Sequence, residues 1–108
     1  MSVLMTFRIK GDPSKLEEMA ASDPDGMRSI ADSAKQHGLI AHRFYGSDDG
    51  QIMVVDEWPD EQSFQSFFEE NQSRIQPMFE AAGADVSGQP DVEFWRVLES
   101  HDKVGWGA

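Results

Sequence analysis

The chain has 108 residues, which fits a single domain. Its 20 Asp and Glu outnumber nine Lys and Arg, and the formal net charge of −11 disfavours binding to nucleic acids and to anionic membranes. Cysteine is absent, which excludes disulfides, thiolate nucleophiles and cysteine-ligated zinc. The N-terminus lacks the pattern of a signal peptide, and no apolar run has the length of a membrane span. We therefore expect a cytoplasmic protein.

The first third of the chain predicts a strand and then a helix in two pieces. Apolar residues recur at every second position of residues 2–10, which indicates a strand. Pro13 suits the first position of a helix over 13–22. Pro24 interrupts that helix, and the apolar spacing after it predicts a second piece over 24–37.

The middle of the chain predicts a β-hairpin. Residues 39–46 and 51–58 have strand character, and Ser47-Asp48-Asp49-Gly50 lies between them. The Asp49-Gly50 pair favours a two-residue turn. Such a turn would set Arg43 opposite Asp56, and a slip by two residues would change these partners but keep the faces.

The last third predicts a second helix and a fourth strand. The helix begins after Pro59, and Phe64, Phe67 and Phe68 form its buried stripe. Pro77 is expected to break or kink it, so that residues 74–82 form a separate turn or two. The remaining segments are a loop, a strand and a short tail with Trp106, expected at residues 86–90, 91–99 and 100–108, respectively.

The element order β-α-β-β-α-β predicts an α+β, ferredoxin-like domain over residues 1–99. Right-handed crossovers give a four-stranded antiparallel sheet with the helices on one face. The other face should then be polar, but the third strand is apolar on both faces at Val54 and Val55. We expect a second copy of the chain to cover it, giving a homodimer with a closed or nearly closed barrel between the subunits.

The predicted hairpin gathers a candidate binding site. Its expected pairing divides the side chains into two faces. One holds Arg43, Tyr45, Ile52, Val54, Asp56 and Trp58, and the other Ile40, His42, Phe44, Met53, Val55 and Glu57. An apolar wall with a cation, a phenol, a carboxylate and an indole is typical of a small-molecule pocket. A cross-strand Arg43–Asp56 pair that closes the core edge is the purely structural alternative.

The stretch VVDEWPDEQSF, from Val54 to Phe64, resembles the end of the third strand and the start of the second helix in the dimeric α/β-barrel superfamily. Within it the chain is similar to antibiotic-biosynthesis-monooxygenase-like domains, over residues 1–99. That superfamily includes monooxygenases, haem-degrading enzymes, isomerases and proteins without known activity. Its haem-degrading branch implies an Asn on the first strand and a His on the second helix, which this sequence lacks.

The resemblance implies a small-molecule-binding barrel, with cofactor-independent oxidation of an aromatic or apolar substrate as the leading hypothesis. This hypothesis includes no cofactor. We also expect no bound metal, since the three His have no metal-like spacing. The alternatives are a non-catalytic ligand-binding or structural barrel and, less favoured, haem binding. The expected catalytic residues are His42 and Arg43, and the expected substrate-binding residues are Tyr45, Asp56, Trp58 and Phe67.

Overall fold

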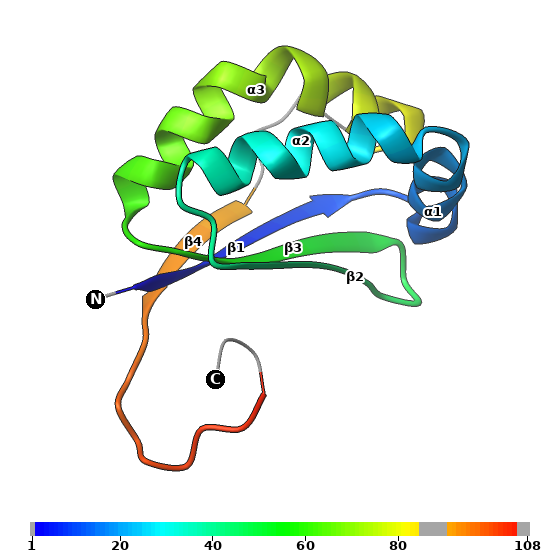
Figure 1. The fold of residues 1–108 in the computed structure, drawn as a ribbon. Helices are drawn as coiled ribbons and strands as arrows, with labels where there is room; N and C mark the ends of the chain where they lie inside the picture. The colour runs from blue at the N-terminus through cyan, green and yellow to red at the C-terminus, as the bar shows by residue number, and fades with distance from the viewer. Residues whose placement is uncertain (1, 85–90, 106–108) are drawn as a thin grey trace.

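The computed structural model describes residues 2–84 and 91–105 (Figure 1). The expected loop at 86–90 and Trp106 lie outside these residues. The predicted β-α-β-β-α-β order is confirmed, with the first helical crossover in two pieces. The elements are β1 (Val3–Lys10), α1 (Pro13–Ser22), α2 (Pro24–Gln36), β2 (Ala41–Gly46), β3 (Gln51–Trp58), α3 (Glu61–Ala81) and β4 (Asp91–Arg96).

The four strands form one antiparallel sheet in the order β2-β3-β1-β4. All three helices lie on the same face of this sheet, as predicted (Figure 1). We call this the covered face and the other the open face. Beyond β4, which ends three residues earlier than predicted, the chain runs away from the helices on the open side (Figure 1).

The two pieces of the first crossover begin where the prolines predicted. The Asp12 side chain accepts a hydrogen bond from the Ser14 backbone N–H at 2.9 Å and caps α1. The Asp23 side chain does the same for α2 through the N–H of Gly26, at 3.1 Å. In both helices proline takes a position whose N–H would have no helical partner, so it costs the helix nothing there.

Helix α3 runs unbroken through Pro77, so the predicted separate turn is wrong. A proline inside a helix costs about 3 kcal/mol, because it removes a hydrogen bond and crowds the preceding turn. Here Pro77 lies on the exposed side, and Ile75 and Phe79 on either side of it are buried in the core. Burial of these two side chains offsets the cost, so packing decides the outcome and not the local preference.

The hydrophobic core lies between the covered face and the helices, and aromatic rings dominate it. Phe7 of β1 stacks on Phe79 of α3 with ring centroids 5.4 Å apart. Trp58 at the end of β3 contacts Phe67 at the same centroid distance and is fully buried. The predicted stripe of α3 is confirmed for Phe64 and Phe67, and Phe68 is partly buried against the same core.

The pairing of the hairpin differs from the prediction by one residue. His42 lies opposite Asp56, and Arg43 lies opposite Val55. The connection is longer than a two-residue turn: Ser47 donates its N–H to the Gln51 carbonyl at 3.0 Å, and Gly50 takes a left-handed φ of +85°. A three-residue loop of this kind changes the pairing by one, and a one-residue change moves every side chain of the strand to the other face.

The predicted faces of β2 are therefore wrong relative to β3. His42 and Phe44 lie on the covered face with Val54 and Asp56, whereas Arg43 and Tyr45 lie on the open face. The sequence analysis had placed Arg43 and Tyr45 on the face of Val54 and Asp56, and His42 and Phe44 on the other face.

The open face carries the apolar residues that the sequence predicted for it. Leu4, Met53 and Val55 are only partly buried there, in the middle of the sheet. Tyr45 and Trp95 flank them and remain 44% and 51% exposed. An antiparallel sheet with a solvated face normally alternates apolar and polar residues, so this face has the composition of a contact surface.

Candidate functional site

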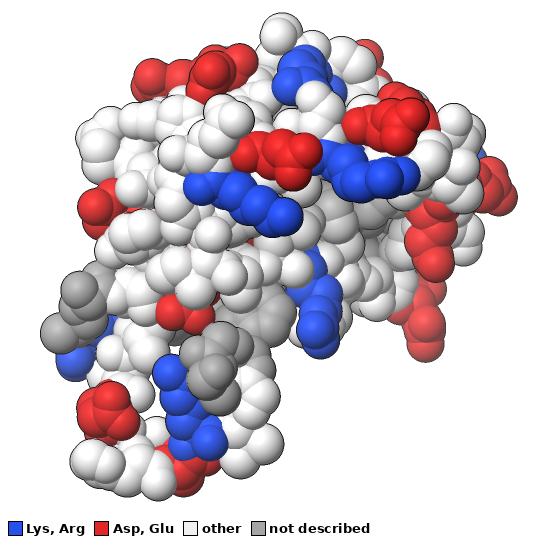
Figure 2. Space-filling view, in the orientation of Figure 1, with Lys and Arg blue, Asp and Glu red and all other residues white. Residues whose placement is uncertain are grey.

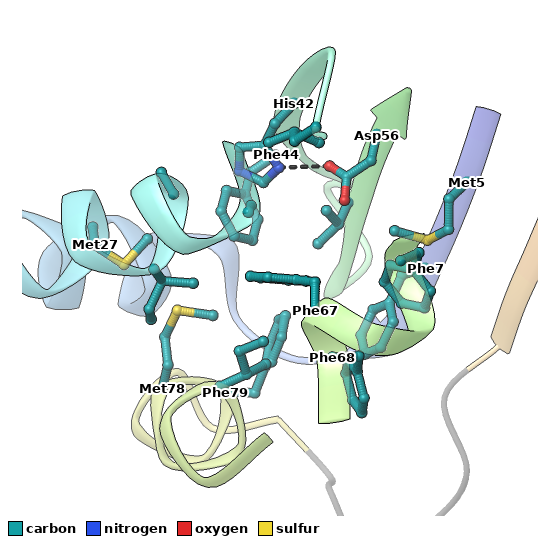
Figure 3. A pocket seen from close by; sticks show the side chains of 17 residues that line it. Met5, Phe7, Met27, His42, Phe44, Asp56, Phe67, Phe68, Met78 and Phe79 are labelled. Carbon is teal, nitrogen blue, oxygen red and sulfur yellow. Dashed lines mark hydrogen bonds and ion pairs between the residues drawn. The ribbon is translucent and has the colours of Figure 1, made fainter. Parts of the chain in front are cut away.

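A cavity of about 80 Å³ lies between the covered face and helices α2 and α3 (Figure 3). Its walls are almost wholly apolar, and His42 and Asp56 are its two polar members that can carry charge. The lining residues are Met5, Phe7, Met27, Ile30, Ala31, Ala34, Leu39, His42, Phe44, Val54, Asp56, Phe64, Phe67, Phe68, Ile75, Met78 and Phe79. An apolar chamber with one converging polar group is the usual form of a small-molecule site.

The polar end of the cavity is a hydrogen-bonded group of three side chains. The Asp56 carboxylate is buried, with 4% of the residue exposed. One of its oxygens lies 2.6 Å from Nδ1 of His42, and the other accepts a hydrogen bond from the indole N–H of Trp58 at 3.1 Å. A buried carboxylate requires partners on its oxygens, and these two side chains supply them.

This arrangement sets the chemistry of the His42 ring. A carboxylate only accepts hydrogen bonds, so this contact favours the His42 tautomer with its proton on Nδ1, in which Nε2 keeps its lone pair. A histidine oriented through one ring nitrogen by a carboxylate is a typical general base, with the other nitrogen as the proton acceptor. The His42 side chain is 34% exposed, so the ring is accessible to an incoming molecule.

Aromatic rings surround the His42–Asp56 pair. The edge of the Phe44 ring meets the His42 ring in a T-shaped contact, with centroids 4.9 Å apart. Phe67 lines the cavity and also packs against Trp58. Figure 3 shows the Phe67 side chain in the space between the hydrogen-bonded pair and the methionines of α2 and α3.

The structure brings together only part of the predicted site. His42, Asp56 and Phe67 line one cavity, and Trp58 contacts two of them from behind the wall. Arg43 and Tyr45 lie on the open face, because the hairpin pairing differs from the expected one. The cavity itself also lies elsewhere than expected: it is enclosed within one chain, and was predicted inside a barrel shared by two.

Several cavity residues had no functional signal in the sequence. Met27 was assigned to a helix face and Met78 to the segment after a helix break, and nothing in either position distinguishes a cavity wall from a filled core. Phe44 was placed on the wrong side of the sheet. Correct hairpin pairing would have found Phe44, but no sequence pattern would have found the methionines.

A second buried polar residue, Asn71 of α3, holds α2 in place. Its amide donates hydrogen bonds to the Ser33 hydroxyl at 2.9 Å and to the Phe67 carbonyl at 3.0 Å, and its oxygen accepts one from Arg74 at 3.2 Å. Asn71 is 2% exposed, so water does not compete for these hydrogen bonds, and each of them contributes to holding the helices together.

Within residues 2–84 and 91–105, no group of three or more His, Asp or Glu side chains is arranged to hold a metal ion. Over the same residues, none of the helices combines the length and the apolarity needed to cross a bilayer.

No protein-family model matches the sequence, and no curated protein sequence matches it. Solved structures do match the fold. SnoaB, a cofactor-independent oxygenase from Streptomyces nogalater, superposes with a TM-score of 0.61 over 94% of this chain and 98% of its own, at 14% identity. The chain has the fold of antibiotic biosynthesis monooxygenases and dimeric ferredoxin-like proteins.

Other structures with this fold differ in what is known of them. A dimeric ferredoxin-like protein from an uncultured marine organism matches with a TM-score of 0.65 over 95% of this chain and 93% of its own, at 13% identity. A protein of unknown function from Nitrosomonas europaea matches with a TM-score of 0.56 over 96% of each chain, at 21% identity. Identities this low establish the fold and leave the chemistry to the site.

Proposed function

We propose that the protein is a cofactor-independent monooxygenase that oxidises a phenolic aromatic compound in the cavity between the sheet and the helices. The observation that carries the proposal is the His42–Asp56 pair at the polar end of a chamber lined by phenylalanines. The shared fold with SnoaB supports it. In this proposal His42 is the catalytic residue, Asp56 positions it, and Phe67 contacts the substrate ring.

The reaction needs one proton acceptor and no external reductant. Nε2 of His42 takes the phenol proton, and the resulting phenolate is electron-rich enough to reduce dioxygen. Oxygen adds at the ring carbon para to the phenolate, and the peroxide then loses water, with the proton held by His42, the hydrogen from that carbon and one oxygen atom. The other oxygen stays as a carbonyl, so phenol and O₂ give quinone and water.

Phenylalanines around the site serve the same chemistry. A dry, apolar chamber strengthens the hydrogen bond between a phenolate and the imidazolium that forms on proton transfer. The Asp56 carboxylate stabilises that imidazolium through Nδ1, and Trp58 holds the carboxylate by its second oxygen. The base is thus oriented before substrate binds, which lowers the cost of its reorganisation during proton transfer.

We further propose that two chains associate through their open faces. Charge supports this arrangement. The strands present three bases there (Arg8, Lys10 and Arg43) against three acids (Glu57, Asp91 and Glu93). The whole chain carries a net charge of −11, so the acid excess lies away from this face. Two copies meet there without the repulsion that other surfaces would impose.

The function is tested by oxygen uptake with 1-naphthol, whose oxidation to 1,4-naphthoquinone also changes its absorbance. His42→Gln removes the base and should lower turnover by about two to four orders of magnitude. Asp56→Asn keeps the shape but not the charge and should lower it less. Tyr45→Phe, a matched change on the open face, should retain activity.

One observation favours a second candidate, a non-catalytic structural barrel. The cavity of about 80 Å³ is far below the roughly 300–1,000 Å³ of typical ligand sites, as in a well-filled core. The absence of both 1-naphthol binding and oxygen uptake, at all substrate concentrations, would support this alternative and contradict the monooxygenase.

A further inference from the structure

We propose that Met27 and Met78 determine how many fused rings the cavity accepts. The inference rests on the aromatic ligand of the proposed function but not on its oxidation. Both methionines line the cavity, Met27 from α2 and Met78 from α3, and both are partly buried. They are specificity-determining residues, and neither belongs to the hydrogen-bonded group at the polar end.

The cavity must enlarge before it can hold even one ring. A cavity of about 150 Å³ accommodates benzene, and this one measures about 80 Å³. Some part of its wall therefore moves when an aromatic molecule enters. The identity of that part decides which ring systems fit.

The aromatic part of the wall is interlocked. Phe79 stacks on Phe7 at 5.4 Å and also meets Phe44 at 6.5 Å, so these three rings hold one another from β1, β2 and α3. Phe67 is similarly held against Trp58. A ring in such a contact network turns only if its neighbours turn with it, which makes this side of the cavity stiff.

The backbone of α2 is also held at several points. The Asp23 side chain caps its first turn, and the Ser33 hydroxyl receives a hydrogen bond from buried Asn71. At its C-terminal end His37 pairs with Glu70 of α3. A helix fixed at its start, middle and end does not swing away as a lid, so the adjustment falls to side chains.

Methionine suits that adjustment better than any other lining residue. It has three rotatable bonds and no branch, whereas the other aliphatic side chains of this wall are shorter or branched. A third lining methionine, Met5, is only 1% exposed and belongs to the fully buried core of the sheet. Met27 and Met78 are the partly buried methionines among the described lining residues.

Their position fits a ligand anchored at the opposite end. In Figure 3 the side chains of Met27 and Met78 reach into the cavity from their two helices, and Phe67 lies between them and Asp56. A hydroxyl group bound at His42 directs the ring along Phe67 toward the two methionines. Each added ring must then displace them, so their size limits the length of the ligand.

The test is calorimetric titration with phenol, 1-naphthol and 9-phenanthrol under anaerobic conditions, so that binding is measured without turnover. Met27→Ala and Met78→Ala should each raise the affinity for 9-phenanthrol relative to phenol by about tenfold. Met19→Ala is the matched control, because Met19 packs against the core from α1 without lining the cavity. It should leave the ratio unchanged.

Met27→Leu and Met78→Leu guard against misfolding, since they conserve volume and are well tolerated in cores. Branching reduces flexibility, so these variants should bind phenol as the unmodified protein does and 9-phenanthrol several-fold more weakly. Equal shifts for all three ligands, an equal change in Met19→Ala, or no binding by any Met27 or Met78 variant would overturn the proposal. Changed ring selectivity without oxygen uptake in air would uphold it while refuting the monooxygenase.

Discussion

Both faces of the sheet carry apolar side chains, more of them on the covered face, and the two faces surround these side chains differently. On the covered face, rings from all four strands pack against those of α3, and the carboxylate of Asp56 is buried among them. On the open face, Tyr45 and Trp95 stand half exposed over a charge-balanced surface. The covered face thus buries one carboxylate, which orients His42, whereas the open face carries equal numbers of acids and bases. Figure 2 shows Lys and Arg mixed with Asp and Glu over the visible side, without one large block of either sign.

The largest expected effect is a loss of stability on removing the tryptophan of the covered face, compared with removing the tryptophan of the open face. Trp58 is fully buried and supports both Asp56 and Phe67, so Trp58→Ala should lower the free energy of unfolding by about 3–5 kcal/mol. Trp95→Ala removes an equal side chain that is 51% exposed. In the proposed dimer Trp95 acts through association, so its effect on urea unfolding should be smaller and should vanish on dilution. Equal, concentration-independent losses would mean that the open face has no partner.

A charge placed on the open face should separate the proposed dimer. Trp95→Glu buries an unpaired carboxylate at the contact, which should weaken association by about 2 kcal/mol or more, roughly a thirtyfold rise in the dissociation constant. Light scattering over a dilution series measures it. Ile40→Glu is the control, since Ile40 is as exposed as Trp95, at 50%, but directly precedes β2 and lies outside the paired strands. A dimer unaffected by Trp95→Glu and lost in Ile40→Glu would place the contact elsewhere.

Much of this contrast was predictable from the sequence, and the prediction failed mainly at the turn between β2 and β3. Alternation and the two prolines located β1, β3, α1 and α2 within a residue or two, because these patterns are local and agree with the packing. The apolar open face followed from Val54 and Val55. Pro77 was misjudged because burial of Ile75 and Phe79, a tertiary effect, outweighs a local penalty.

The candidate site was harder to predict because it depends on pairing between strands. Sequence singled out His42, Asp56, Trp58 and Phe67, yet joined Asp56 to Arg43. Asp49-Gly50 suits a two-residue turn and also ends a longer loop, and only the backbone at Gly50 separates the two. One residue of loop length therefore decides whether His42 meets Asp56 or faces away from it.

Gly50 should accordingly be sensitive to substitution. Its φ of +85° is strained for any residue with a β-carbon, so Gly50→Ala should cost about 1 kcal/mol in the free energy of unfolding. Gly105→Ala is the control, because Gly105 has a φ of +63° in the tail with no atom near its β-carbon position. Strain there should leave unfolding unchanged, since residues around it unwind without loss of packing. In Gly50→Ala the NMR signals of His42 should also shift if the loop sets its pairing.

The smallest expected effect is a pH dependence at the start of α3, the helix that carries Phe64 and Phe67 over the covered face. The Ser63 backbone N–H, and then the Ser63 hydroxyl, donate hydrogen bonds to the Asp60 carboxylate and hold its pKa below the ordinary value of 3.8. A carboxyl whose pKa is lowered by folding adds stability above its unfolded pKa and loses it as pH falls through the folded one.

Asp60→Asn also caps a helix but does not titrate. Unfolding midpoints of the two proteins should therefore converge as the pH falls below about 4, with the original chain the more stable at neutral pH. Because Asp60 is fully exposed and the effect is screened by salt, the difference should shrink in high salt, whereas the stability lost in Trp58→Ala should persist. A difference that stays constant from neutral pH down to acid pH would show that the cap acts through geometry and not through charge.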